Sequence, residues 1–183
     1  MVEKPSIPTY ESSLRHNILK MPEAVYEASG IVINGRRIKS LVFTTDLAII
    51  RNCDADAVFA VYPFTPQQAI SDAIIKAAYI PVFCGIGGGV THGVRTIGLA
   101  KDVECQGAMG VVMNAPISNL NLRAVAAAVD ITVIVTVTTS ETDIIDKPTI
   151  RAALIRRTAR IFSVVLDIMN KSDRKGRILL LGF

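Results

Sequence analysis

The chain has 183 residues, of which 50% are hydrophobic, 5% are aromatic and none is tryptophan, and its formal net charge is +4. This composition fits one globular domain. No apolar run approaches the roughly 18 residues of a membrane span, so a membrane protein is not expected. Few aromatic rings are present to stack on the bases of a single-stranded nucleic acid. The N-terminus has no basic stretch before an apolar core, so we expect no secretory signal and a cytoplasmic protein.

The first predicted elements are a helical lead and a hairpin. Residues 5–29 read as a helical segment. Asn34-Gly35 then stands between two β-type runs within residues 30–38, and this pair is preferred in a two-residue type I′ turn. The second arm of the hairpin leads into Ile38–Phe43, whose apolar character predicts the first core strand.

From this strand onward, β-rich apolar runs alternate with helical patterns in units of about 25 residues. Repeated strand-then-helix units imply right-handed crossovers and a parallel sheet. We therefore expect an α/β protein with a parallel sheet of about five or six strands in an incomplete TIM-barrel-like fold. The predicted core strands are residues 38–43, 57–62, 80–84, 108–113 and 131–137.

The last part of the chain differs in charge. Residues 151–183 contain 8 basic and 2 acidic side chains, whereas residues 1–150 contain 12 basic and 14 acidic ones. We predict a long basic helix over Thr149–Lys171, followed by a short terminal strand. The resulting division is an α/β partial barrel over residues 1–148 and a basic ending over residues 149–183. Only this ending is a candidate for contact with nucleic acid.

Small or polar residues follow five of the predicted strands, and parallel strands bring their carboxyl ends to one rim. The candidate catalytic residues at this rim are Asp46, Cys84 and Asn114. Asp46 could act as a base or could cap the next helix. Cys84 as a nucleophile would need His16 or His92 as its base. Asn114 could bind a carbonyl or hydroxyl group, or it could form a turn.

The glycine-rich loop Gly85–Gly89 is the strongest local signal. Glycines allow a ligand to approach the backbone, and the N–H groups of Gly87, Gly88 and Gly89 would bind a phosphate or carboxylate at the entry to the next helix. The alternative is a tight turn without a ligand. The loop matches neither a Walker sequence nor the dinucleotide pattern. Because the three cysteines also lack metal-binding spacing, the sequence indicates no metal site and no particular cofactor. We expect all three thiols to be reduced, and those outside the rim to be buried.

Together these segments resemble a family of prokaryotic (β/α)-barrel proteins of unestablished activity that are often labelled "hydrolase". More distantly, the layout is similar to phosphate-binding TIM barrels. Beyond about Asp143 the chain departs from the pattern, which would continue with further strand-helix units and a second phosphate loop. The blocks that carry the resemblance are Ile38–Asp46, Ala60–Pro66, Pro81–Gly89, Gln106–Pro116 and Ile134–Val137.

Three functions follow from these observations. The first is a metabolic enzyme, a hydrolase by the family label, that acts on a small phosphorylated or carboxylated molecule through the rim residues. The second is a non-catalytic, metabolite-sensing module whose glycine loop holds an anion while the basic ending contacts RNA or another acidic partner. The third is assembly with a second copy through an open sheet edge or the basic helix. Convergent titratable groups with shifted pKa values would favour the enzyme.

The basic ending should open at a lower free energy than the core, because its charge differs in sign and the family resemblance fades at the same place. Hydrogen exchange should find the backbone amides of residues 149–183 less protected than those of Ile131–Val137. Equal protection in both segments would mean that the ending completes the domain.

Overall fold

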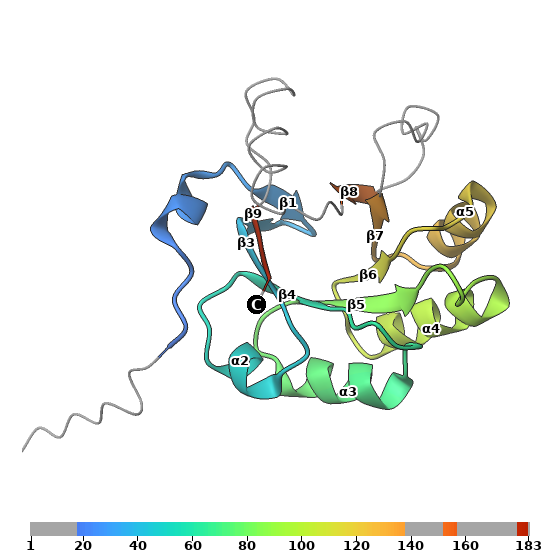
Figure 1. The fold of residues 1–183 in the computed structure, drawn as a ribbon, viewed down its shortest axis with the longest axis horizontal. Coiled ribbons are helices and arrows are strands. Elements are labelled where there is room, and N and C mark those ends of the chain that lie inside the picture. Colours follow the sequence, from blue (N-terminus) through green and yellow to red (C-terminus); the bar gives the residue numbers. More distant parts are fainter. Residues whose placement is uncertain (1–17, 138–151, 157–178, 183) are drawn as a thin grey trace, which may run out of the picture.

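The structure is a computed structural model that describes residues 18–137, 152–156 and 179–182 (Figure 1). Its largest element is a seven-stranded sheet in the order β8-β7-β6-β5-β4-β3-β9, in which all neighbouring strands are parallel. The strands are β3 (Ser40–Phe43), β4 (Ala57–Ala60), β5 (Val82–Gly87), β6 (Gly110–Met113), β7 (Thr132–Val137), β8 (Ala152–Arg156) and β9 (Leu179–Gly182). The helices between them are α2 (Leu47–Arg51), α3 (Gln68–Ala77), α4 (Val94–Cys105) and α5 (Asn119–Ala128).

This architecture confirms the predicted α/β fold. Each of the five predicted core strands overlaps one of the strands β3 to β7, and these strands lie side by side in chain order. The last strand of the described chain, β9, pairs with the first core strand, β3. Among the described strands, β8 and β9 form the two edges of the sheet and do not pair with each other. The sheet therefore resembles an open barrel.

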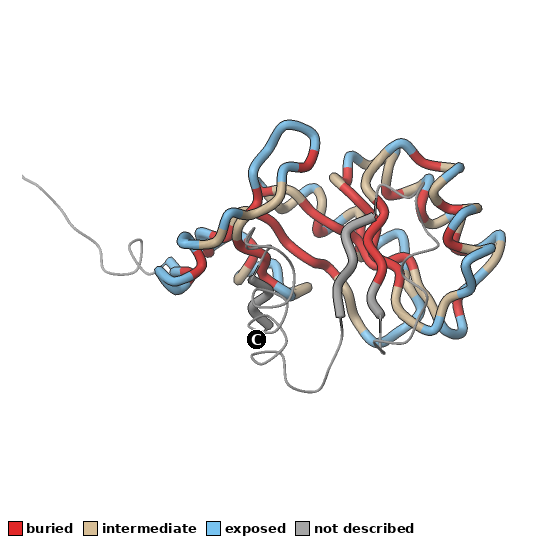
Figure 2. The backbone as a smooth tube through the Cα atoms, turned by 90° about the horizontal axis from the view of Figure 1, so that it is seen from above, coloured by how far each residue is buried: buried red, intermediate tan, exposed pale blue. Residues whose placement is uncertain are grey.

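The two faces of the sheet bury different side chains because successive residues of a strand point to opposite faces. Figure 1 shows the helices along the outside of the sheet, and Figure 2 shows buried residues along the strands and on one side of the helices. The helix-facing layer includes Val42, Val58 and Val111. The inner layer contains Phe59 and Phe83, whose rings meet edge-on with their centres 5.3 Å apart.

A hairpin adds to the inner layer. It consists of β1 (Ile31–Ile33) and β2 (Arg36–Ile38), which pair antiparallel. Asn34 and Gly35 have φ values of 49° and 78°, so both turn residues are left-handed, as the predicted type I′ turn requires. The hairpin buries Ile33 and Ile38 against the inner layer.

The predicted helical lead is wrong where it can be compared with the structure. Between residues 18 and 29 the helical part is one short 3-10 helix, η1 (Glu23–Glu27). The N–H of Leu19 donates to the carbonyl of Asn52, and the Leu19 carbonyl accepts from the N–H of Asp54, so this stretch is extended. The remainder of the lead lies outside the described residues.

The predicted helix over Thr149–Lys171 is also wrong at residues 152–156, which form β8. This short apolar run fits a helix or a strand equally well by its periodicity, and here it pairs with β7 from Val133↔Ala152 to Val137↔Arg156. The predicted terminal strand is confirmed as β9. Residues 157–178 lie outside the described part of the chain. The division into residues 1–148 and 149–183 stays a prediction, and so does the pairing with a second copy.

The amino ends of β3 and β4 are joined by a buried polar contact. The Asp56 carboxylate accepts from the N–H groups of Lys39 and Ser40 at 2.8 and 3.0 Å, and the hydroxyl of the fully buried Ser40 accepts from the Asp56 N–H at 2.8 Å. These bonds satisfy groups that would otherwise be costly to bury. Within the described segments, no helix has the length and apolar character to cross a membrane.

The lack of a side chain at Gly110 allows β6 to pack closely against β5 and β7. A Cβ atom at this position would stand 2.6 Å from the Thr132 carbonyl oxygen and 2.7 Å from the Phe83 ring. We therefore expect Gly110→Ala to lower the free energy of unfolding by about 1–3 kcal/mol, measured by urea denaturation. Gly98→Ala in α4 is the control, because a Cβ there meets nothing within 4 Å and alanine favours a helix. If Gly110→Ala unfolds at the same urea concentration as the unchanged protein, the described spacing of these strands is contradicted.

Candidate functional site

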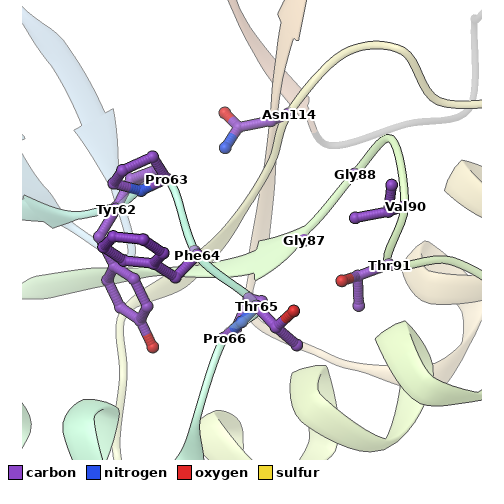
Figure 3. Close-up of a pocket in the computed structure, with 12 residues that line it drawn as sticks. Tyr62, Pro63, Phe64, Thr65, Pro66, Gly87, Gly88, Val90, Thr91 and Asn114 are labelled. Atoms are coloured by element: carbon purple, nitrogen blue, oxygen red, sulfur yellow. The ribbon is translucent and has the colours of Figure 1, made fainter.

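A cavity of about 480 Å³ lies at the carboxyl ends of β4, β5 and β6 (Figure 3). The loop after β4 forms one side and the glycine-rich loop after β5 forms the other, while Asn114 follows β6. Its volume falls in the range of small-molecule sites. The lining residues are Val61, Tyr62, Pro63, Phe64, Thr65, Pro66, Gly85, Gly87, Gly88, Val90, Thr91 and Asn114.

The loop after β4 carries apolar side chains into the mouth of the cavity. The Tyr62 hydroxyl accepts a hydrogen bond of 2.8 Å from the N–H of Gln67, which precedes the first residue of α3. This bond satisfies a helix-entry donor, since Gln67 makes no side-chain cap. Phe64 is 74% exposed in the same loop.

Two backbone donors of the glycine-rich loop already have acceptors within the protein. The N–H of Gly88 donates to the Thr91 carbonyl at 3.0 Å, and the N–H of Gly89 donates to the Pro116 carbonyl at 2.8 Å. Both donors are therefore occupied in this conformation, one by a bond within the loop and the other by a bond to the loop after β6. Phosphate binding by Gly87, Gly88 and Gly89 stays a prediction, and these two donors give it no support.

Gly88 serves a packing role that the sequence did not reveal. Its φ of 131° disfavours other residues, and a Cβ atom would lie 1.7 Å from the Asn114 carbonyl oxygen. The backbones of the two loops thus touch, and the Asn114 N–H donates to the Gly87 carbonyl at 2.8 Å. This contact places Asn114, one of the predicted site residues, beside the cavity.

Asp46 lies away from this cavity and caps α2. Its Oδ1 accepts from the N–H groups of Ala48 and Ile49 at 2.7 and 3.3 Å, and Asp46 is not one of the lining residues. The helix-cap alternative is confirmed. The proposed role of Asp46 as a catalytic base gains no support from its position.

Cys84 points to the helix-facing layer and not to the cavity. It is completely buried there, and burial raises the pKa of its thiol to about 12, against a smaller lowering by a hydrogen bond with Ser71. A protonated thiol is a poor nucleophile, so this environment gives the predicted catalytic role of Cys84 no support. His92 is exposed and does not line the cavity, and His16 lies outside the described residues.

The electrostatic character of the cavity is nearly neutral. Of the described residues that line it, Tyr62 is the one with a titratable side chain. The described part of the chain also contains no group of three His, Cys, Asp or Glu side chains placed to hold a metal ion. The sequence predicts that the residues after the strand over 57–62 lie at the rim, but it does not single out Phe64, Val90 or Thr91 as lining residues.

The cysteines should differ sharply in reactivity. Cys84 and Cys53 are buried, whereas Cys105 is exposed, contrary to the expected burial of that thiol. At pH 8 we expect iodoacetamide to alkylate Cys105 in the folded protein and to leave Cys84 unmodified, because the Cys84 thiol ionises only near pH 12. Mass spectrometry after alkylation measures this, and Cys105→Ser provides the blank. Modification of Cys84 at the rate of Cys105 would contradict its described environment.

Comparisons with known proteins agree with the fold. No protein-family model matches the sequence, and no curated protein is significantly similar to it. Three solved dihydrodipicolinate synthases are similar in structure. The protein from Agrobacterium tumefaciens is 17% identical at a TM-score of 0.53, that from Bacillus anthracis is 13% identical at 0.53, and that from Aquifex aeolicus is 18% identical at 0.50.

These similarities cover 75%, 78% and 74% of this chain, respectively, and 62%, 62% and 54% of the other proteins. The chain thus spans less than two thirds of the length of the three solved structures. At such low identity the likeness shows the fold alone. The described part of the chain has a TIM-barrel-like α/β fold.

Proposed function

We propose that this chain is the substrate-binding part of a TIM-barrel-type metabolic enzyme, and that it holds a small metabolite at the carboxyl ends of β4, β5 and β6. The observation that carries the proposal is the cavity of about 480 Å³ at this end of the sheet. In TIM barrels this is the end at which active sites lie. The similar solved structures are named as enzymes of small-molecule synthesis, which supports the same class.

The cavity suits a ligand that hydrogen-bonds without a full charge. Asn114 supplies a carboxamide that can donate and accept, and Thr65 supplies a hydroxyl. Gly85 and Gly87 place no side chain in the space between them. A carbonyl or hydroxyl group of the metabolite is the natural partner of Asn114. The phosphorylated or carboxylated substrate expected from the glycine loop lacks a cationic partner among the described lining residues.

A non-catalytic binding module is the second candidate. The observation in its favour is that no carboxylate, histidine, cysteine or lysine lines the described part of the cavity. Hydrolysis needs a group that activates water, and Tyr62 already accepts a hydrogen bond from Gln67. The hydrolase assignment therefore rests on the family resemblance alone.

Nuclear magnetic resonance titration of the full chain tests the binding proposal. Dihydroxyacetone offers carbonyl and hydroxyl groups without charge, pyruvate adds a carboxylate, and inorganic phosphate is an anion alone. We expect dihydroxyacetone to shift the signals of Gly87, Thr91 and Asn114 in a saturable way. Asn114→Ala should weaken this binding about tenfold, as expected for a lost hydrogen bond in a partly buried site.

Asn119→Ala is the matched control, since Asn119 is exposed at the start of α5 and does not line the cavity. It should bind dihydroxyacetone like the unchanged chain. Shifts with phosphate that centre on Gly87, Gly88 and Gly89 and persist in Asn114→Ala would instead support the anion site expected from the sequence. If none of the three probes shifts the lining residues, the cavity is not a metabolite site and the proposal fails.

A further inference from the structure

We infer that the ligand of this cavity is an uncharged amphipathic molecule, with an apolar ring or chain between Phe64 and Val90 and a hydrogen-bonding group near Asn114. The inference rests on the proposed function and goes beyond it by naming the class of ligand. It is carried by the way apolar and polar residues are distributed over the lining.

The mouth of the cavity is apolar and open to solvent. Phe64 is 74% exposed and Val90 is 88% exposed, and Figure 3 shows them on opposite sides of the cavity. They come from two different loops, and Pro63 and Pro66 extend the apolar surface on the Phe64 side. A ligand between the loops would remove both side chains from water, and such burial favours binding.

Two glycines of β5 contribute backbone to the lining of the cavity. Gly85 and Gly87 lie along β5 where any other residue would add a side chain, and both line the cavity. Gly87 has a φ of 113°, and a Cβ there would stand 2.6 Å from the Thr91 side chain. The side-chain position of Gly87 is thus filled by Thr91, and the open apolar surface for a ring is that of the exposed Phe64 and Val90 side chains.

The absence of charge in the described lining argues for an uncharged ligand. No basic or acidic side chain is among these residues. A charged ligand would lose water without gaining an opposite charge, which is costly, whereas an amide, ketone or hydroxyl can exchange its water for Asn114 or a threonine hydroxyl. The inner polar group and the apolar mouth together define an amphipathic molecule.

Three simple probes separate these properties in a titration of the full chain followed by nuclear magnetic resonance. Benzamide has a ring and an uncharged amide, acetamide has the amide alone, and benzoate has the ring with a negative charge. We expect benzamide to bind most tightly and to shift the signals of Phe64, Val90 and Asn114. Phe64→Ala and Val90→Ser should each weaken benzamide binding about fivefold and leave acetamide binding unchanged.

Matched controls are Leu120→Ala and Val94→Ser, because Leu120 and Val94 are 78% and 85% exposed but do not line the cavity. Neither should alter benzamide binding. Equal binding of benzamide and acetamide would overturn the amphipathic ligand while leaving the proposed metabolite site intact, whereas tighter binding of benzoate would overturn the uncharged class. If Phe64→Ala abolishes self-association measured by light scattering and leaves benzamide binding unchanged, the apolar mouth is a contact between copies and the inference fails.

Discussion

The candidate site depends on the close approach of two loop backbones. Gly88 lies so near Asn114 that even a methyl group would overlap the Asn114 carbonyl oxygen, and bonds from Asn114 to Gly87 and from Gly89 to Pro116 join the loops on either side. The loops after β5 and β6 therefore behave as one unit. Backbone contact therefore sets the cavity wall and the point from which the Asn114 side chain extends.

Strand alternation then decides which rim residues can reach a ligand. On β5, Cys84 faces the helices, while its neighbours Gly85 and Gly87 line the cavity. Position at a strand end is thus insufficient for a catalytic role, because every second residue points away from the barrel interior. Cys84 contributes to packing beside Ser71, and Asp46, beyond the end of β3, contributes to the start of α2.

The sheet could be predicted because each core strand is a short run rich in β-branched residues and bounded by turn residues. The hairpin could be predicted because few residue pairs other than Asn-Gly favour a type I′ turn. Of the candidate site residues, Asn114, Gly87 and Gly88 line the cavity. The two glycines were predicted to bind an anion, whereas in the structure they contact Asn114 and Thr91. Segments 18–22 and 152–156 were misread as helical, because pairing with distant backbone decides their conformation. Phe64 and Val90 could not be identified individually from the sequence, because the sequence does not show which surface an exposed apolar side chain faces.

In the described part of the chain, the residues that line the cavity all lie between Val61 and Asn114, within two consecutive strand-helix units and the strand that follows them. The strand pairs beside the cavity join neighbouring units, so they close much shorter stretches of chain than the pairing of β3 with β9. During synthesis the ribosome releases this stretch before β8 and β9, so a nascent chain can assemble the cavity ahead of the sheet edges. Formation of the candidate site and completion of the sheet are therefore separable steps.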